Sequence, residues 1–139
     1  MTVAETLQPL RKHLVVAAER VMNGAFAGAE APELEKSQLN HLIAVCNEAA
    51  CSKEIELYLR YQAARDGRLW PPKLVQTIVE DMTKILQDEL PPHGDRDALE
   101  TGAWILYAVY LARTFTYKKA AHKEARNQPA GGGNNRGRQ

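Results

Sequence analysis

The sequence predicts an all-α fold, a single compact bundle of about five helices. Apolar residues recur at steps of three and four along five segments, which is the spacing of one helical face. The alternation of apolar and polar residues that marks a half-buried strand is absent from the sequence. With 139 residues, the chain is long enough for one ordinary globular domain and too short for two.

The first expected helix runs from residue 3 to about residue 22. Its apolar stripe is formed by Leu7, Leu10, Leu14 and Val21, with Ala17 or Ala18 between them. Two breakers follow, the pair Asn23-Gly24 and then Gly28.

The second expected helix reaches about residue 50 and has Pro32 in its first turn. Glu30, Glu33 and Glu35 would then lie near the positive end of its dipole. Its apolar positions are Leu34, Leu39, Leu42, Ile43, Val45 and Cys46.

The third and fourth expected helices are joined by the linker GRLWPP. Ser52 is expected to cap the third helix, which ends near Gly67. Two prolines start the fourth helix, which continues to Leu90. The predicted buried residues are Ile55, Tyr58, Leu59 and Gln62 or Ala63 in the third helix, and Leu74, Ile78, Met82, Ile85 and Leu86 in the fourth.

The fifth expected helix spans residues 98–121 and should be the central, most buried one. Asp97 and Glu100 have the spacing of a capping box at its start. Residues 101–112 carry no charge, so we expect Trp104, Leu106 and Val109 to be mostly buried. Residues 127–139 include three consecutive glycines and no large aliphatic side chain. We therefore expect a helical domain over residues 1–126 and a disordered tail over residues 127–139.

Composition and length exclude several classes of protein. The formal charge is +1, so bulk charge favours neither nucleic acid nor a membrane as partner. The longest uncharged stretch has 12 residues, and a bilayer-spanning helix needs about 20. The N-terminus lacks the pattern of a secretion signal, so we expect no membrane association and a cytoplasmic location. Cys46 and Cys51 have neither zinc-site nor redox-motif spacing.

The patterns of enzyme active sites are also missing from the sequence. No histidine has a glutamate three positions before it, as a di-iron bundle would require. Arg113 and His122 are too far apart to be hydrogen-bonding neighbours on one helix, and His41 and Cys46 point away from each other. The segment His93-Gly94-Asp95 resembles half of a metal site, but the sequence has no second His-Asp pair to complete it. Glu80-Asp81 is interpreted as a solvated face. We therefore expect a protein without catalytic residues, metal or cofactor.

Charge is unevenly distributed along the chain. Residues 1–59 have a net charge of −3, residues 60–73 of +3, residues 74–100 of −5 and residues 101–139 of +6. Basic residues at helix C-termini often only complement the dipole and stay solvated. If the two basic groups meet, they form a positive groove for phosphates, with Tyr61 and Tyr117 available to stack on unpaired bases. The groups consist of Arg60, Arg65, Arg68 and Lys73, and of Arg113, Lys118, Lys119, Lys123 and Arg126.

Three segments resemble a known family. They are SQLNHLIAVCNEA (37–49), IELYLRYQAARDG (55–67) and AVYLARTFTYKKAA (108–121). In this order they are similar to the small all-helical (Csm) subunit of type III-A CRISPR-Cas effector complexes. Asn40 stands where that family usually has a basic residue, and Ala64 replaces a glycine. These departures leave open a relative, such as the corresponding small subunit of type III-B or III-D complexes.

The resemblance implies a non-catalytic structural subunit that stacks in several copies and contacts guide RNA and target RNA. Its other partners would be the backbone subunits and the large polymerase-like subunit of the complex. Base pairing would supply sequence specificity, so backbone contacts from basic side chains would suffice. The predicted RNA-binding residues are Arg60, Arg65, Arg68, Arg113, Lys118 and Lys119.

Two alternatives remain open at this point. One is a helical adaptor or antitoxin-like partner that binds another protein and no nucleic acid. The other is a small helical nuclease or transferase. The sequence gives neither the copy number, nor the oligomeric state of the free protein, nor the RNA strand contacted.

Overall fold

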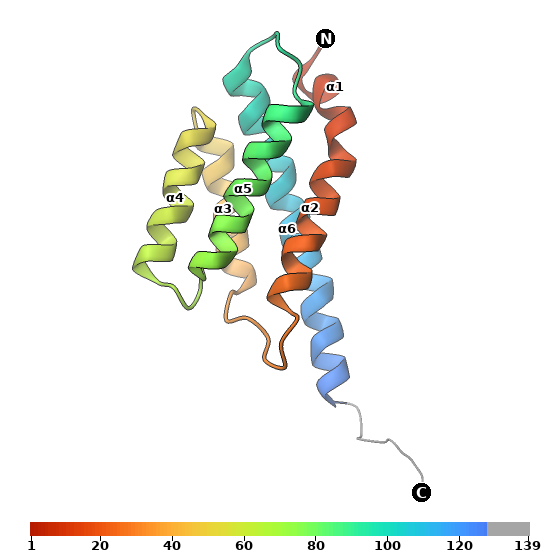
Figure 1. The fold of residues 1–139 in the computed structure, drawn as a ribbon, viewed down its shortest axis with the longest axis vertical. Coiled ribbons are helices and arrows are strands. Elements are labelled where there is room, and N and C mark those ends of the chain that lie inside the picture. The colour runs from red at the N-terminus through yellow and green to blue at the C-terminus, as the bar shows by residue number, and fades with distance from the viewer. Residues whose placement is uncertain (128–139) are drawn as a thin grey trace, which may run out of the picture.

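The computed structural model describes residues 1–127, which form an all-helical bundle (Figure 1). No strand occurs among these residues. The first expected helix is present as two helices joined by a 3₁₀ turn, which together we call the first rod. Each of the other four expected helices is present as a single helix. The elements are α1 (Val3–Leu7), η1 (Gln8–Leu10), α2 (Arg11–Ala25), α3 (Lys36–Glu48), α4 (Ser52–Arg65), α5 (Pro72–Glu89) and α6 (Arg96–Asn127).

The first rod begins at a capping box. Thr2 Oγ1 accepts a hydrogen bond from the Glu5 backbone N–H at 3.1 Å, and Glu5 Oε1 accepts one from the Thr2 N–H at 2.9 Å. Pro9 lacks the N–H that a continuous α-helix would use, and the chain forms the 3₁₀ turn η1 there. The predicted stripe from Leu7 to Val21 is buried, as expected.

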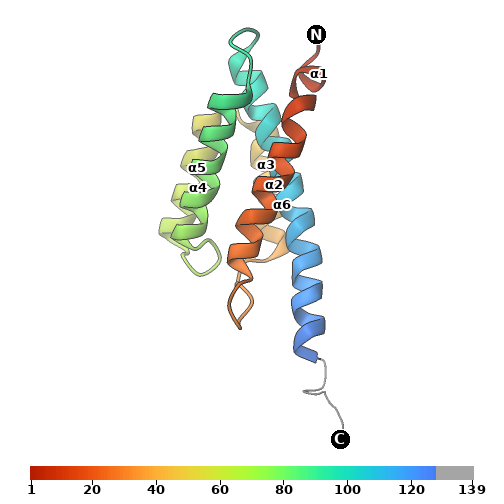
Figure 2. The ribbon, with the colours of Figure 1, turned by 45° about the vertical axis from the view of Figure 1, so that its right-hand side comes forward.

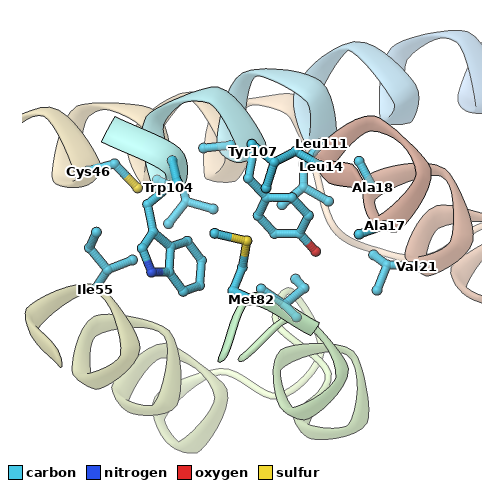
Figure 3. Packing of buried hydrophobic residues seen from close by; sticks show 14 of the residues in the cluster. Leu14, Ala17, Ala18, Val21, Cys46, Ile55, Met82, Trp104, Tyr107 and Leu111 are labelled. Carbon is cyan, nitrogen blue, oxygen red and sulfur yellow. The ribbon is translucent and has the colours of Figure 1, made fainter. Parts of the chain in front are cut away.

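Helix α6 is the centre of the bundle, as predicted. It packs against α1, α2, α3, α4 and α5. Trp104 and Tyr107 are fully buried, and Figure 3 shows Ile55 of α4 and Met82 of α5 beside the Trp104 ring. The indole Nε1–H of Trp104 donates to Ser52 Oγ at 2.8 Å.

Within α6, the residues that face the neighbouring helices differ in part from the predicted set. Leu106 and Val109 are only partly buried, whereas Tyr107 and Leu111 are fully buried. Because residues 101–112 are uncharged all round, hydrophobicity alone does not define the inner face. The positions of α2, α3 and α5 around α6 define it.

Three predicted helix starts were wrong. Helix α3 begins after Glu35, whose backbone is extended and whose N–H donates to Gln38 Oε1, so Pro32 lies in the connector. Cys51 is the N-cap of α4, because the hydroxyl of Ser52 is turned inward to Trp104.

At the start of α6, Asp95 Oδ1 accepts from the Ala98 N–H at 3.2 Å, in place of the expected Asp97 and Glu100 box. Glu100 instead accepts a hydrogen bond from Arg96 Nε at 2.7 Å. Trp70, in the linker before α5, is buried, and its burial was not predicted from the sequence.

The C-terminal end of α6 extends past the ends of the other helices (Figures 1 and 2). The helix continues to Asn127, six residues beyond the expected end. The remainder of the predicted disordered tail, residues 128–139, lies outside the described residues. Among residues 1–127, no helix combines the length and the hydropathy that crossing a bilayer requires.

Candidate nucleic-acid interface

The C-terminal end of α4 presents an exposed ring beside a cation. Tyr61 is 57% exposed, and the guanidinium carbon of Arg65 lies 5.8 Å from the centre of its ring. Arg65 Nη2 also donates to Gln62 Oε1 at 2.9 Å, which holds the guanidinium near the ring. Burial raises the pKa of the neighbouring Tyr58, and the positive charge of Arg65 opposes that rise. An aromatic ring and a guanidinium together form a surface on which a nucleotide base can stack.

The other two predicted residues of this region differ in their surroundings. Arg60 is exposed and lines a groove of about 440 Å³ between α4 and α5. Arg68 follows α4 in the linker, and its Nη1 donates to Glu33 Oε1 of the connector at 3.2 Å. A phosphate would therefore compete with the Glu33 carboxylate for Arg68, whereas Arg60 forms no ion pair with an acidic side chain of residues 1–127.

The second predicted group lies on the C-terminal half of α6. Arg113 and Lys119 are exposed, and Lys118 is partly buried. Lys118 Nζ lies 5.7 Å from the ring centre of Tyr117, and Lys119 Nζ lies 5.6 Å from that of Phe115. Aromatic rings thus alternate with cations on α6 as on α4.

Acidic and backbone groups hold the end of α6 against neighbouring segments. The Tyr117 hydroxyl donates to Glu19 Oε2 of α2 at 3.2 Å. His122 Nε2 lies 3.2 Å from the Ala29 carbonyl oxygen, and its ring lies 5.9 Å from that of Phe26. These contacts fix the connector between α2 and α3 onto α6.

The six predicted residues lie in two clusters along the chain, one at the end of α4 and in the linker after it, and one on the C-terminal half of α6. The C-termini of α2, α4 and α6 all lie at one end of the bundle, and the α4 and α6 ends are separated by the end of α2 and the connector (Figures 1 and 2). The connector contacts Arg68 of the first cluster through Glu33, and it contacts α6 through Ala29, which lies beside His122. The contact of both clusters with a single RNA stays a prediction.

Among residues 1–127, no group of three or more metal-ligating side chains comes together. Burial raises the pKa of Cys46 to about 12, so its thiol stays protonated at neutral pH. The His41 ring packs at a tilt of 44° against Tyr58, with 5.8 Å between ring centres. Its ring is engaged with α4.

A buried polar group in the core was not predicted from the sequence. The Tyr107 hydroxyl is fully buried and has no hydrogen-bond partner among residues 1–127. Burial, and then the negative charge of Asp81, raise the pKa of Tyr107. Asp81 in turn lies 3.5 Å from Arg20 and is only 18% exposed, so the interpretation of Glu80-Asp81 as a solvated face holds for Glu80 alone. The sequence signal for the partial burial of Asp81 is its position three residues after the buried Ile78, which places both on one face of α5.

The chain was compared with known proteins at the level of family, sequence and fold. No protein-family profile, no curated protein and no solved structure was found to match it. The functional interpretation therefore depends on the residues of this chain and on the resemblance of its three segments.

Proposed function

We propose that this protein is a non-catalytic, RNA-binding structural subunit of a type III CRISPR-Cas effector complex. The observation that carries the proposal is the pairing of exposed tyrosines with cations at one end of the bundle. Tyr61 with Arg65 and Tyr117 with Lys118 each combine a stacking surface with a group that binds phosphate. Both pairs lie on helices that the core holds in place.

The chemistry of these clusters fits contact with an RNA backbone. Arginine and lysine side chains on a helix neutralise phosphates without reading base edges. A protein that lines a guide–target duplex needs no more than that, because base pairing supplies the sequence information. Guide RNA and target RNA, the backbone and large polymerase-like subunits, and other copies of this chain are the proposed partners.

Reconstitution of the complex tests this role. The protein is co-expressed with the remaining subunits of a type III complex from the same genome and with a guide RNA. We expect it to copurify with the complex in more than one copy, which native mass spectrometry counts. We also expect it to remain bound to the part of the RNA that the complex protects from nuclease. A complex that assembles and binds target RNA without this protein, and excludes it when it is added, would reject the role.

One observation favours a second candidate function, that of a helical protein–protein adaptor. Leu57 on α4 is 69% exposed beside Tyr61, so α4 carries an apolar surface that RNA binding alone does not require. An adaptor would bind its protein partner with little dependence on salt and would show no affinity for RNA.

A further inference from the structure

Helix α4 has an outer surface that the rest of the described chain covers only in part, where His41 of α3 packs against Tyr58. It packs against α5 and α6 and lies at the edge of the bundle (Figure 1). Leu57 and Tyr61 are 69% and 57% exposed, and they border a shallow depression on this surface. We call this surface the α4 strip, and its residues are Glu54, Leu57, Tyr58, Tyr61 and Arg65.

The spacing within the α4 strip is that of a helix-packing seam. Residues 54, 58, 61 and 65 follow one another at steps of four, three and four, so their side chains form one row along the helix. Leu57 adds an aliphatic side chain beside the middle of this row. By the same geometry, Lys53 and Arg60 lie on the flank of Leu57, four residues before it and three residues after it.

The charges of the α4 strip are complementary to those of the same strip turned end to end. Glu54 lies at its N-terminal end and Arg65 at its C-terminal end, and the residues of the strip between them, Leu57, Tyr58 and Tyr61, are uncharged. If two α4 helices pack antiparallel across a two-fold axis between residues 59 and 60, Glu54 of each copy faces Arg65 of the other. Tyr58 then faces Tyr61 at the centre, where two aromatic rings pack favourably.

We propose that the α4 strip is the interface of a homodimer in which two α4 helices pair antiparallel. A two-fold interface requires a self-complementary surface, and the α4 strip has that property in the placement of its charges and its aromatic side chains. A single helix pair gives a small interface, so the dissociation constant is expected at about 10 to 100 µM. The proposal does not depend on the proposed function, because pairing is measured without RNA.

Arg65 and Tyr61 also belong to the α4 cluster assigned to RNA. Pairing of two α4 helices and contact of α4 with RNA therefore exclude each other. The dimer is the state of the free protein, and addition of RNA is expected to dissociate it.

Charge reversal tests the antiparallel arrangement. Glu54→Lys and Arg65→Glu each place like charges opposite one another twice in a homodimer, so each variant alone should dimerise at least about tenfold more weakly. An equimolar mixture of the two variants restores both opposite-charge contacts, so a heterodimer should form with nearly wild-type affinity. Sedimentation velocity from about 5 to 500 µM measures these constants, and circular dichroism checks that each variant is folded.

A third variant keeps the test decisive if Glu54→Lys weakens the helix start, where Glu54 Oε1 accepts from the Ala50 N–H. Leu57→Asp should weaken dimerisation at least about tenfold, whereas the control Val16→Asp, at a 47% exposed site on α2, should leave it unchanged. A wild type that stays monomeric at the highest concentration overturns the proposal. So does a dimer that none of the three α4 variants weakens. A mixture that dimerises much more tightly than the wild type would indicate parallel helices and would also overturn it.

Discussion

The hydrogen bond between Ser52 and Trp104 fixes the start of α4 to the central helix, and its removal has a predictable cost. Ser52 Oγ and Trp104 Nε1 lie 2.8 Å apart, and both residues are buried. Ser52→Ala leaves the indole N–H without an acceptor in the core. An unsatisfied buried donor costs about 1–3 kcal/mol, so the free energy of unfolding should fall by that amount.

A double-mutant cycle separates this hydrogen bond from general packing effects. Trp104→Phe removes the donor, so Ser52→Ala in that background should cost about 1 kcal/mol less than in the wild type. Urea denaturation followed by circular dichroism gives the free energies, with Ser37→Ala, at an exposed serine, as the control. An equal cost of Ser52→Ala in both backgrounds would refute the account of how α4 is held.

Three further predictions follow from burial and hydrogen bonding. Leu111→Ala, at a fully buried position, should cost about 2–5 kcal/mol in urea denaturation, and Leu106→Ala, at a partly buried one, clearly less; equal costs would mean that α6 is rotated from its described position. Iodoacetamide should label Cys51 in the folded protein and spare Cys46, which is buried and has its pKa raised to about 12. Labelling of Cys46 in the folded protein, detected by mass spectrometry of peptides, would show that the core is open. The hydrogen bonds from Thr2 lower the pKa of Glu5 below 4.5. The ionised Glu5 side chain therefore stabilises the fold above pH 4.5, and this contribution is lost as the pH falls through the lowered pKa. In thermal melts over this acidic range, the Glu5→Gln variant should lose less stability than the wild type.

The helices and most of the core were predictable because they depend on local periodicity. The stripe from Leu7 to Val21 is buried as expected, and so are Ile78, Met82 and Leu86 of the fourth predicted stripe, since one charged face leaves only one face for the core. Residues 101–112 have no charged face, so periodicity could not predict that Tyr107 and Leu111 are more deeply buried than Leu106.

Helix starts depend on competition between neighbouring polar side chains, which a pattern does not resolve. Ser52 was a reasonable cap, but a tertiary partner, Trp104, takes its hydroxyl. The signal Thr2-x-x-Glu5 was present in the sequence and was missed.

The spatial relation of the two basic clusters was not predictable from the sequence. It depends on the path of the connector, which contacts Arg68 through Glu33 and α6 through Phe26. The residue types in each cluster were predictable, because the charge of residues 60–73 and 101–139 departs from that of the rest of the chain.

RNA binding by the two clusters is the central claim, and matched charge-removal variants isolate it. The interface variant carries three alanine substitutions drawn from both clusters, at Arg65, Arg113 and Lys118. The control variant removes the same charge from exposed lysines outside the clusters, at Lys12, Lys36 and Lys84. Circular dichroism checks that both variants keep the helical content of the wild type.

The affinity of each protein for a fluorescent single-stranded RNA, measured over a series of salt concentrations, tests the claim most directly. Each phosphate contact on a single strand contributes about 0.7 to the slope of log affinity against log salt, so the interface variant should lose up to about 2 units of slope. The control variant should keep the wild-type slope. If the folded interface variant and the wild type have the same slope, or if the wild type does not bind RNA, the claim is wrong.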